Sequence, residues 1–572
     1  MATKTIESGT VADAYLAILA DRGVDFLFAN AGTDFAPLIE ALAKAQTKGT
    51  PTPRPITVPH ENVAMAMAIG HYMVSGRPQL VMVHVNVGTT NAMCNLVNAS
   101  KGNIPILFSA GRTPYTETGN LTGKRSVEIH WPQEMRDQAS ILREFVKWDY
   151  ELHHQEVVET AVDRALNIAM SEPRGPIYLT LPRETLAAEV ENFTYTSPTR
   201  HKTPSPPHPD KAAVDEAAQI LADAKNPLII TSGFGARPAD VPVLEALAES
   251  FALPVVQRKP RYMVLPCDHP MHIGYNPDAH IEDADVVLVL ECDVPWIPGK
   301  ITPPDDCKII HIGTDPLFSS YPIRGFTCDL AITGIPGATL ALLTEALGGH
   351  AKRASKRIDA RRKRIKALRD SQSEARKAVL DSSRDETPIH PAWISHCIDN
   401  IRDDDAIVIK ESPLAWDHLG LTQPGTFFCN TFGGGLGYGL GTALGAKLAA
   451  PGRQVICTVG DGAYMFGNPI PAHYVGAAEG LPTLTVIFNN EMWGAVKRNT
   501  RDVYPSGYAA QSNNEPLTYF VSGTRFERAV EISDGYGEQV DDPAQVPAAL
   551  DRAMDAVAGG RQAVLNILCK GP

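Results

Sequence analysis

The stretch GDGAYMFGNPIPAHYVGAAEGLPTLTVIFNN, residues 460–490, decides how this 572-residue chain is interpreted. It follows the apolar run VICTV and closes on a second one, TLTVIF, so we predict two short buried strands with a helical segment between them. A polar residue stands where each strand ends: Asp461, between two glycines, and Asn490. Because open α/β sheets bind ligands at the carboxyl ends of their strands, we expect these two side chains to share one site.

The chemistry of these side chains suits a hard divalent cation. Mg²⁺ prefers oxygen ligands, and it usually combines one or two protein groups with waters and phosphate oxygens. Gly460 and Gly462 allow the backbone to approach phosphates closely, because they carry no side chain. The spacing of the GDG, a helix and a strand ending in Asn-Asn therefore predicts a Mg²⁺–diphosphate site. The alternative is a Gly-rich turn and an unrelated pair of asparagines.

The same alternation of apolar runs and helical patterns continues in both directions from this stretch. It predicts parallel sheets with helices on both faces, and hence an α/β fold made of three doubly wound parallel-sheet domains. Short apolar runs bounded by Gly or Pro recur in the first part (PQLVMVHV, PILFSAG, GPIYLTLP) and in the middle (NPLIITSG, DVVLVLEC, CKIIHIGTD). The predicted domains are 1–190, 205–350 and 386–572, with a basic helical connector at 351–385.

Bulk composition excludes several classes of protein. A formal net charge of −13 argues against binding of nucleic acid or anionic membranes. No apolar run approaches the ~20 residues that a membrane helix requires, and the first residues lack the apolar block of a signal peptide. Nine scattered cysteines without a C-x-x-C pair indicate a reducing compartment. We expect a cytoplasmic protein, and we interpret the basic connector as a solvated interdomain helix rather than a polyanion site.

Residues 460–490 resemble the diphosphate- and Mg²⁺-binding motif of thiamine diphosphate (ThDP)-dependent enzymes of the acetolactate synthase and benzoylformate decarboxylase type. The three-domain layout is similar too, so the resemblance covers essentially the whole chain. It implies a pyrimidine-binding domain first, a central domain without ThDP, and a diphosphate-binding domain last. Asp461, Asn490 and the backbone carbonyl of Met492 would hold Mg²⁺, with Gly460 and Gly462 beside the cofactor.

The resemblance also requires a glutamate in the first domain, and the sequence PHEN supplies Glu61. A carboxyl group beside the pyrimidine nitrogen favours the imino tautomer of the cofactor, whose amine takes the proton from the thiazolium carbon. The alternative is a solvated glutamate at a helix start, where the helix dipole favours a negative charge.

Further cofactor contacts follow from the resemblance. Gly434 would offer its carbonyl to the aminopyrimidine, and Leu436 would be the apolar wedge that bends the cofactor. Glu411 and Ser412, at another predicted strand end, would line the diphosphate pocket. An ordinary Gly-rich helix entry is the competing interpretation of residues 432–450.

Substrate-side residues match two subfamilies. His84, in VHVNVGTTNAM, falls where benzoylformate decarboxylases carry an active-site histidine, which would exchange protons near neutral pH. Gln133, in HWPQEM, falls in a stretch similar to that of acetolactate synthases, near the reactive carbon of the cofactor. Asn499 stands where acetolactate synthases carry a tryptophan, which puts true acetohydroxyacid synthase activity in doubt. Purely structural roles remain the alternatives for His84 and Gln133.

The implied activity is ThDP- and Mg²⁺-dependent cleavage or formation of a carbon–carbon bond of a 2-oxo acid, by a decarboxylase or an acetolactate synthase-like carboligase. The reaction would pass through the ylid and an enamine–carbanion. Alternatives are a 2-hydroxyacyl-CoA lyase or oxalyl-CoA decarboxylase-like enzyme acting on an acyl substrate, and a non-catalytic nucleotide-binding or regulatory homologue. The resemblance also implies a homodimer or homotetramer with active sites at the subunit interface. FAD or ADP in the central domain, at SGFGARPAD, is the less favoured cofactor expectation.

Overall fold

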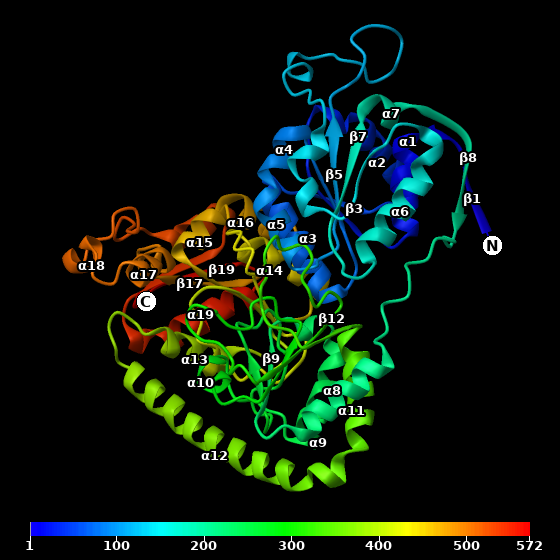
Figure 1. Cartoon of the computed structure of the whole chain (residues 1–572). Coiled ribbons are helices and arrows are strands. Elements are labelled where there is room, and N and C mark those ends of the chain that lie inside the picture. The colour runs from blue at the N-terminus through cyan, green and yellow to red at the C-terminus, as the bar shows by residue number, and fades with distance from the viewer. Residues whose placement is uncertain (1, 572) are drawn as a thin grey trace.

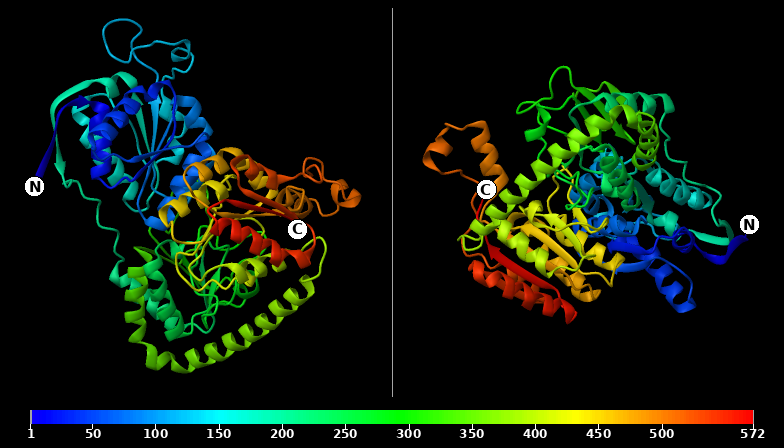
Figure 2. Two further views of the ribbon diagram at one scale, coloured as in Figure 1. Left: turned by 180° about the vertical axis from the view of Figure 1, so that it is seen from behind. Right: turned by 90° about the horizontal axis from the view of Figure 1, so that it is seen from below.

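A computed structural model describes residues 2–571 and contains three parallel β-sheets, each flanked by helices (Figure 1). The predicted α/β class with three doubly wound sheets is thereby confirmed. Figure 2 shows the same arrangement from behind and from below, with the first domain, the central domain and the third domain as separate layered bodies. Apolar side chains fill the space between the sheets and their helices. One buried cluster lies in the first domain, one in the central domain and one mainly in the third, and a fourth continues from the first domain into the third.

The first sheet has the strand order β3-β2-β4-β5-β7-β6, and all its pairings are parallel. The helix that precedes it starts at a capping box, in which Thr10 and Asp13 bind each other's backbone N–H groups. The strands are β2 (Phe26–Asn30), β3 (Arg54–Thr57), β4 (Leu80–Val83), β5 (Leu107–Arg112), β6 (Asp149–Glu151) and β7 (Ile177–Pro182). The helices are α1 (Val11–Asp21), α2 (Ala36–Lys48), α3 (Glu61–Ser75), α4 (Val85–Asn91), α5 (Met93–Lys101), α6 (Val158–Met170) and α7 (Arg183–Ala187).

The central sheet has five parallel strands in the order β10-β9-β11-β12-β13. Its middle strands are continuous apolar runs because helices cover both faces. The strands are β9 (Pro227–Thr231), β10 (Val255–Gln257), β11 (Val286–Leu290), β12 (Lys308–Gly313) and β13 (Leu330–Thr333). The helices are α8 (Lys211–Asp223), α9 (Val241–Phe251), α10 (Asp278–Ile281) and α11 (Pro336–Gly348).

The third sheet repeats the topology of the first, with the order β15-β14-β16-β17-β19-β18. The two apolar runs predicted around residues 460–490 are β16 and β17, which pair directly with each other. The strands are β14 (Ile407–Glu411), β15 (Phe427–Cys429), β16 (Val455–Gly460), β17 (Leu484–Asn489), β18 (Tyr536–Val540) and β19 (Ala563–Leu568). The helices are α13 (Pro391–Ile401), α14 (Gly439–Ala449), α15 (Asp461–Phe466), α16 (Pro469–Ala478), α17 (Gly494–Val503), α18 (Tyr508–Ser512) and α19 (Val546–Ala558).

A two-stranded antiparallel ribbon lies outside these sheets and was not predicted. It joins β1 (Ala2–Thr10) to β8 (Glu189–Ser197) and lies at the edge of the first domain, beside the label N in Figure 1. Neither strand has the clean apolar alternation by which a strand is recognised in a sequence. The ribbon carries the chain from the first domain toward the central one.

The basic stretch forms one long helix, α12 (Ala351–Ser383), which runs from the central domain to the third (Figure 1). Several of its arginines cap other helices instead of facing solvent. Arg361, 2% exposed, donates to the carbonyls of Phe251 at 3.0 Å and Ala224 at 2.7 Å, at the ends of α9 and α8. Carbonyls at helix ends lack partners within their own helix, and cations stabilise them. Part of the basic charge of α12 therefore stabilises the helix ends of the central domain.

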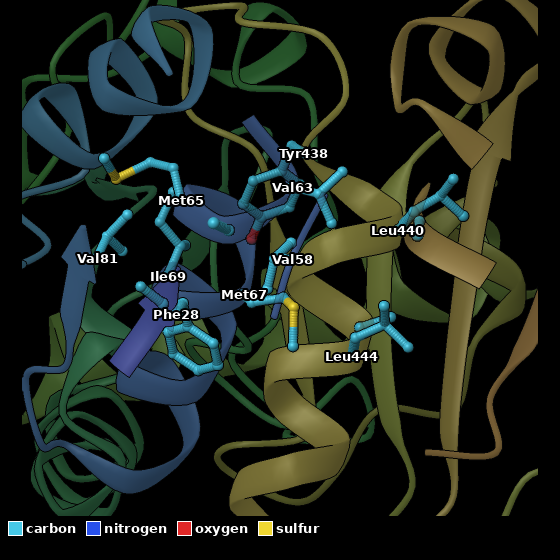
Figure 3. Packing of buried hydrophobic residues seen from close by; sticks show 14 of the residues in the cluster. Phe28, Val58, Val63, Met65, Met67, Ile69, Val81, Tyr438, Leu440 and Leu444 are labelled. Carbon is cyan, nitrogen blue, oxygen red and sulfur yellow. The ribbon is translucent and has the colours of Figure 1, made fainter. Parts of the chain in front are cut away.

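The first and third domains meet where α3 crosses α14 (Figure 3). The two backbones approach so closely that a Cβ on Gly445 would lie 1.9 Å from the Met67 carbonyl oxygen. A Cβ on Gly70 would likewise lie 2.0 Å from the Thr442 carbonyl oxygen. Glycines at the crossing therefore fix how near the two helices come. Since α3 begins at Glu61, this contact also positions that residue relative to the third domain.

Among the helices of residues 2–571, none combines the length and the apolar character needed to cross a bilayer.

Candidate active site

Predicted site residues gather at the topological switch points of the first and third sheets. In the third sheet, β14 and β16 are neighbours from which the chain proceeds in opposite directions, and the first sheet has the same relation at β2 and β4. In the third sheet, β14 ends at Glu411 and β16 ends at Gly460. In the first sheet, β2 ends at Asn30 and His84 directly follows β4. Crevices at such points are the usual ligand sites of open α/β sheets.

Asp461 has the properties of a metal ligand. It is 3% exposed, and its Oδ2 is buried without a hydrogen-bond partner among residues 2–571. Its Oδ1 accepts a hydrogen bond from the Gly462 N–H at 2.8 Å. Burial raises the pKa of the carboxyl group to about 6. A buried carboxylate oxygen without a partner is costly, and a bound cation would remove that cost.

The structure brings Asn490 and Met492 to this carboxylate. Asn490 Oδ1 accepts from the Met492 N–H at 3.1 Å, and the Met492 N–H also lies close enough to Asp461 to influence its pKa. Between them, Glu491 adopts a positive φ of 56°, which turns the chain sharply after β17. No group of three or more His, Cys, Asp or Glu side chains converges within the described residues as a metal site. A cation at this place would therefore be coordinated by Asp461, by amide or backbone oxygens, and by oxygens of the ligand that binds with it.

A cavity of about 600 Å³ opens at this corner. The predicted residues Glu411, Ser412 and Leu436 line it, and Gly434 lies outside its lining, in the turn before Leu436 with φ of +67°. All lining residues belong to the third domain: His390, Pro391, Lys410, Glu411, Ser412, Pro413, Cys429, Asn430, Leu436, Gly460, Asp461, Gly462, Ala463, Phe488, Asn490, Met492, Trp493, Gly494, Ala495, Arg498, Lys570 and Gly571.

Glu411 has a structural role besides lining the cavity. Glu411 accepts from the backbone N–H groups of Tyr438 at 3.2 Å and Gly439 at 2.7 Å, so it caps the start of α14. Burial raises the pKa of Glu411 to about 7.

The absence of a side chain at Gly462 is explained by Trp493, whose ring would lie 2.3 Å from a Cβ there. The glycine thus gives room to a tryptophan that lines the cavity.

In the first domain, Glu61 is held firmly at the start of α3. It is 8% exposed, and its two carboxylate oxygens accept from Asn30 Nδ2 at 2.9 Å and Asn91 Nδ2 at 2.5 Å. These bonds fix the orientation of the carboxylate. Glu61 does not line the cavity of the third domain within this chain.

His84 lies near Glu61 and forms a close pair with Asp34. The Nδ1 atom of His84 is 2.5 Å from Oδ1 of Asp34, which is 2% exposed. The hydrogen bond to Asp34 is the main cause that raises the pKa of His84, and the charge of Glu61 acts in the same direction. Since Nδ1 donates to Asp34, Nε2 is left to accept or donate a proton.

The surroundings of this pair are tightly constrained. A Cβ on Gly32 would lie 2.2 Å from Nδ1 of His84, and one on Gly111 would lie 1.7 Å from Oδ2 of Asp34. Val85, directly after His84, has a φ of 37°, which a β-branched residue adopts only under strain. Strain of this kind, typically about 1–3 kcal/mol, concentrates at functional sites.

Gln133 reaches the same place from the long loop between β5 and β6. Its amide lies close enough to His84 to help raise the pKa of the imidazole. The structure therefore joins the three predicted catalytic residues, Glu61, His84 and Gln133, in one part of the first domain.

The first domain also contacts the turn of the third domain that carries Leu436. Asn98 Nδ2 donates to the Gly435 carbonyl at 2.8 Å, and Asn95 Nδ2 donates to the Gly437 carbonyl at 3.1 Å. Helix α5 thus supports the turn that carries Leu436.

Sequence reasoning missed two residues with evident roles. Asp34 follows the end of β2 by four residues, and a polar residue after a glycine at a strand end could have indicated it. Lys410 lines the cavity although it is 8% exposed, and a lysine inside the apolar run IVIKE was a visible signal.

The Gly-x-Gly of the central domain is explained by packing. A Cβ on Gly235 would lie 2.0 Å from the Met263 carbonyl oxygen, and one on Gly233 would lie 2.6 Å from the Arg261 guanidinium. Close internal contacts therefore account for both glycines.

Comparison with protein families gives three matches that cover most of the chain. The N-terminal TPP-binding domain of thiamine pyrophosphate enzymes matches residues 9–141, their central domain matches 214–343, and their C-terminal TPP-binding domain matches 411–567. These ranges contain Glu61, His84 and Gln133 in the first match and Asp461 and Asn490 in the last.

Individual relatives are distant but nearly full-length. Benzoylformate decarboxylase of Pseudomonas aeruginosa is 27% identical over 85% of this chain and 87% of its own. Sulfoacetaldehyde acetyltransferase of Castellaniella defragrans is 25% identical over 99% of this chain and 94% of its own. The solved structure of benzoylformate decarboxylase from Polynucleobacter necessarius matches with a TM-score of 0.78 at 20% identity, covering 98% and 99% of the two chains, and shows the same fold.

Proposed function

Because the chain belongs to the thiamine pyrophosphate enzyme family, we propose that it is a Mg²⁺-dependent enzyme that decarboxylates a 2-oxo acid. Carboligation, as in acetolactate synthases, is the second outcome. The observation that carries the proposal is the buried, unpartnered Oδ2 of Asp461, which lines a cavity together with Asn490. Mg²⁺ held by a bound diphosphate would be the missing partner of that oxygen.

The residues of the third domain fit this cofactor. Asp461, Asn490 and the Met492 carbonyl would hold the cation, and Leu436 would support the bent cofactor in the cavity. When bound, ThDP supplies an electron sink that stabilises the charge left on carbon as carboxylate departs. The apolar side of the cavity, with Phe488 and Trp493, favours loss of CO₂ because charge disappears in that step.

The His84–Asp34 pair favours decarboxylation to an aldehyde. The product requires a proton on the carbon that lost CO₂, and His84 can deliver one from Nε2 while Asp34 holds Nδ1. Gln133, whose amide lies beside His84, would orient the substrate. Acyl transfer to a second substrate competes with this protonation, and the relative named sulfoacetaldehyde acetyltransferase makes that outcome worth measuring.

We further propose a homodimer, or a homotetramer built from two such dimers, in which Glu61 of one protomer completes the cavity of its partner. The cavity is lined only by third-domain residues of its own chain. Next to it, α15 and α16 expose large apolar side chains: Met465 41%, Phe466 47%, Ile470 44% and Tyr474 51%. Exposed apolar side chains of this kind beside an open site suit a second copy of the chain.

The function is tested by CO₂ release from a panel of 2-oxo acids, with ThDP and Mg²⁺ present and Glu61→Gln as the matched variant. We expect release by the wild type that disappears in the variant, and product analysis then separates aldehyde from acyloin. Absence of release with every acid, although ThDP binds, would reject 2-oxo acids as substrates and direct attention to 2-hydroxyacyl-CoA thioesters.

The shared site is tested by mixing two inactive variants, Glu61→Gln and Asp461→Asn. If each site uses residues of both protomers, mixed dimers contain one intact site, and an equimolar mixture recovers about a quarter of wild-type activity. If each site lies within one chain, the mixture stays inactive.

A further inference from the structure

The long loop between β5 and β6 carries Gln133, yet it buries almost no side chain. Among residues 115–137, all of which the structure describes, His130 is the one buried residue. Figure 1 shows the loop extending beyond the end of β5, and exposed Leu121 borders a cavity of about 800 Å³ beside it. Because the loop lacks apolar packing of its own, its position depends on polar contacts.

Arg183 supplies several of these contacts. It is the first residue of α7, directly after β7, and it is 7% exposed. Its Nε donates to the Gly123 carbonyl at 2.7 Å. Its Nη2 donates to the Lys124 carbonyl and, at 3.3 Å, to Ser126 Oγ. A buried guanidinium needs acceptors in fixed directions, and the loop provides three of them.

The same guanidinium also holds the turn that carries the partner of His84. Its Nη1 donates to the Thr33 carbonyl at 3.2 Å, and the next residue, Asp34, binds His84. His130 makes a second connection, because its Nδ1 accepts from the Ser126 N–H at 3.2 Å and its Nε2 lies 3.1 Å from Thr33 Oγ1. Loop and turn are therefore joined twice, once by the guanidinium and once by the imidazole.

We propose that Arg183 is a positioning residue: it holds the loop against the turn after β2 and thereby keeps Gln133 beside His84. Gln133 follows His130 by three residues, so it belongs to the segment that is joined to the turn. Arg183 does not line the cavity of the third domain, so its effect on the reaction is indirect. The kinetic part of this inference rests on the proposed function, whereas the position of the loop does not.

Trypsin reports the position of the loop without any substrate. Cleavage after Lys124 requires attack on the carbonyl that Arg183 holds, so this bond is protected while the contact exists. Arg183→Lys keeps the charge but replaces a planar fork of donors by a single ammonium group, which cannot serve all the acceptors. We expect cleavage after Lys124 to become at least about tenfold faster, the loss that corresponds to one charge-assisted hydrogen bond. Cleavage after exposed Lys202, in the linker to the central domain, is the internal reference and should not change.

Arg22→Lys is the matched control. The side chain of Arg22 is 3% exposed, and it donates to Asp163 at 2.7 Å and to the Thr196 carbonyl at 2.9 Å in the same domain, without contact to the loop. This change should leave cleavage after Lys124 as it is in wild type. Ser126→Ala, at an exposed position, removes one acceptor and should raise the hydrogen-exchange rates of the loop amides, which keeps the test valid if Arg183→Lys fails to fold.

Kinetics separate a positioning role from a loss of stability. Arg183→Lys should lower kcat/KM by about tenfold, and this loss should nearly vanish when Gln133 is already replaced by alanine, because residues that act through each other are not additive. The limb of the pH profile assigned to His84 should move to lower pH, since Gln133 no longer supports the raised pKa of His84. His84 also faces the charges of Asp34 and Glu61, and the lysine variant alters neither.

Two results would overturn the proposal. Equal cleavage after Lys124 in wild type and Arg183→Lys would mean that the loop does not depend on Arg183. Faster cleavage with the same loss of kcat/KM in both backgrounds would leave Arg183 a structural role and reject its link to Gln133. If no 2-oxo acid is turned over, the proposed function fails, but cleavage still tests the hold on the loop. The link to Gln133 is then tested by NMR titration of His84, whose pKa should fall in Arg183→Lys; an unchanged pKa would reject the link.

Discussion

Replacement of Asp34 by asparagine tests the role assigned to the His84–Asp34 pair. Asparagine has nearly the same shape, so it fits between Gly32 and Gly111, where a larger side chain would not. It removes the negative charge and the carboxylate that fixes Nδ1 of His84 as the donor. A hydrogen bond between charged groups contributes about 1.5–3 kcal/mol, and one pKa unit corresponds to about 1.4 kcal/mol. We therefore expect the pKa of His84 to fall by about one to two units.

The shift should appear in two measurements. The limb of the pH–kcat/KM profile that reports the free enzyme's histidine should move to lower pH by the same one to two units. In wild type, the pKa of His84 is raised above its ordinary value of 6.5. The stability from the charged pair is therefore fully present below pH 6.5 and is lost as pH rises through the raised pKa. The difference in unfolding free energy between wild type and Asp34→Asn should shrink over the same range.

Asp215→Asn, an exposed change in the central domain, is the control for loss of one charge. A limb that stays in place in Asp34→Asn, with ThDP binding intact, would refute the assigned role of Asp34 as the residue that positions and charges His84.

Two further changes test the packing that positions the site. Gly445→Ala should lower the unfolding free energy by about 1–3 kcal/mol, because its Cβ would meet the Met67 carbonyl at the α3–α14 crossing, whereas Gly452→Ala, in open space, should be neutral in thermal denaturation. Arg361→Ala should lower the unfolding free energy by about 2–4 kcal/mol, since it leaves buried carbonyls at the ends of α8 and α9 without donors. Its control, Lys363→Ala at an exposed position of the same helix, should lower the unfolding free energy by less than about 0.5 kcal/mol. If urea denaturation showed a variant to be as stable as its control, the contact assigned to that residue would be contradicted.

The fold was accessible from sequence because its strands are short, apolar and bounded by Gly or Pro. β16 and β17 could be placed to within a residue, since buried parallel strands have continuous apolar runs. The ribbon of β1 and β8 could not be found in this way: Glu189, Glu191 and Thr194 interrupt any apolar pattern, and its pairing joins residues far apart in sequence. Long-range pairing of polar segments leaves no local signal.

The candidate site was predicted where a motif fixes spacing and missed where contacts are tertiary. Asp461 and Asn490 follow from one continuous stretch, and the family resemblance added Glu61, His84 and Gln133. Their partners depend on how strands and loops meet in space. The contact of His84 with Asp34 spans 50 residues, and it exists only because β2 and β4 are adjacent. Sequence alone therefore indicates which groups are present more readily than how they are oriented.

The central claim is that the third domain binds a diphosphate through a divalent cation at Asp461. Calorimetric titration of ThDP into the metal-free protein, with Mg²⁺ or with EDTA, tests this claim most directly, and Asp461→Asn is the matched variant. We predict binding that requires Mg²⁺ and that weakens at least about a hundredfold in the variant, while the variant without ligand stays folded. Equal ThDP affinity with and without Mg²⁺, or in wild type and Asp461→Asn, would contradict the account.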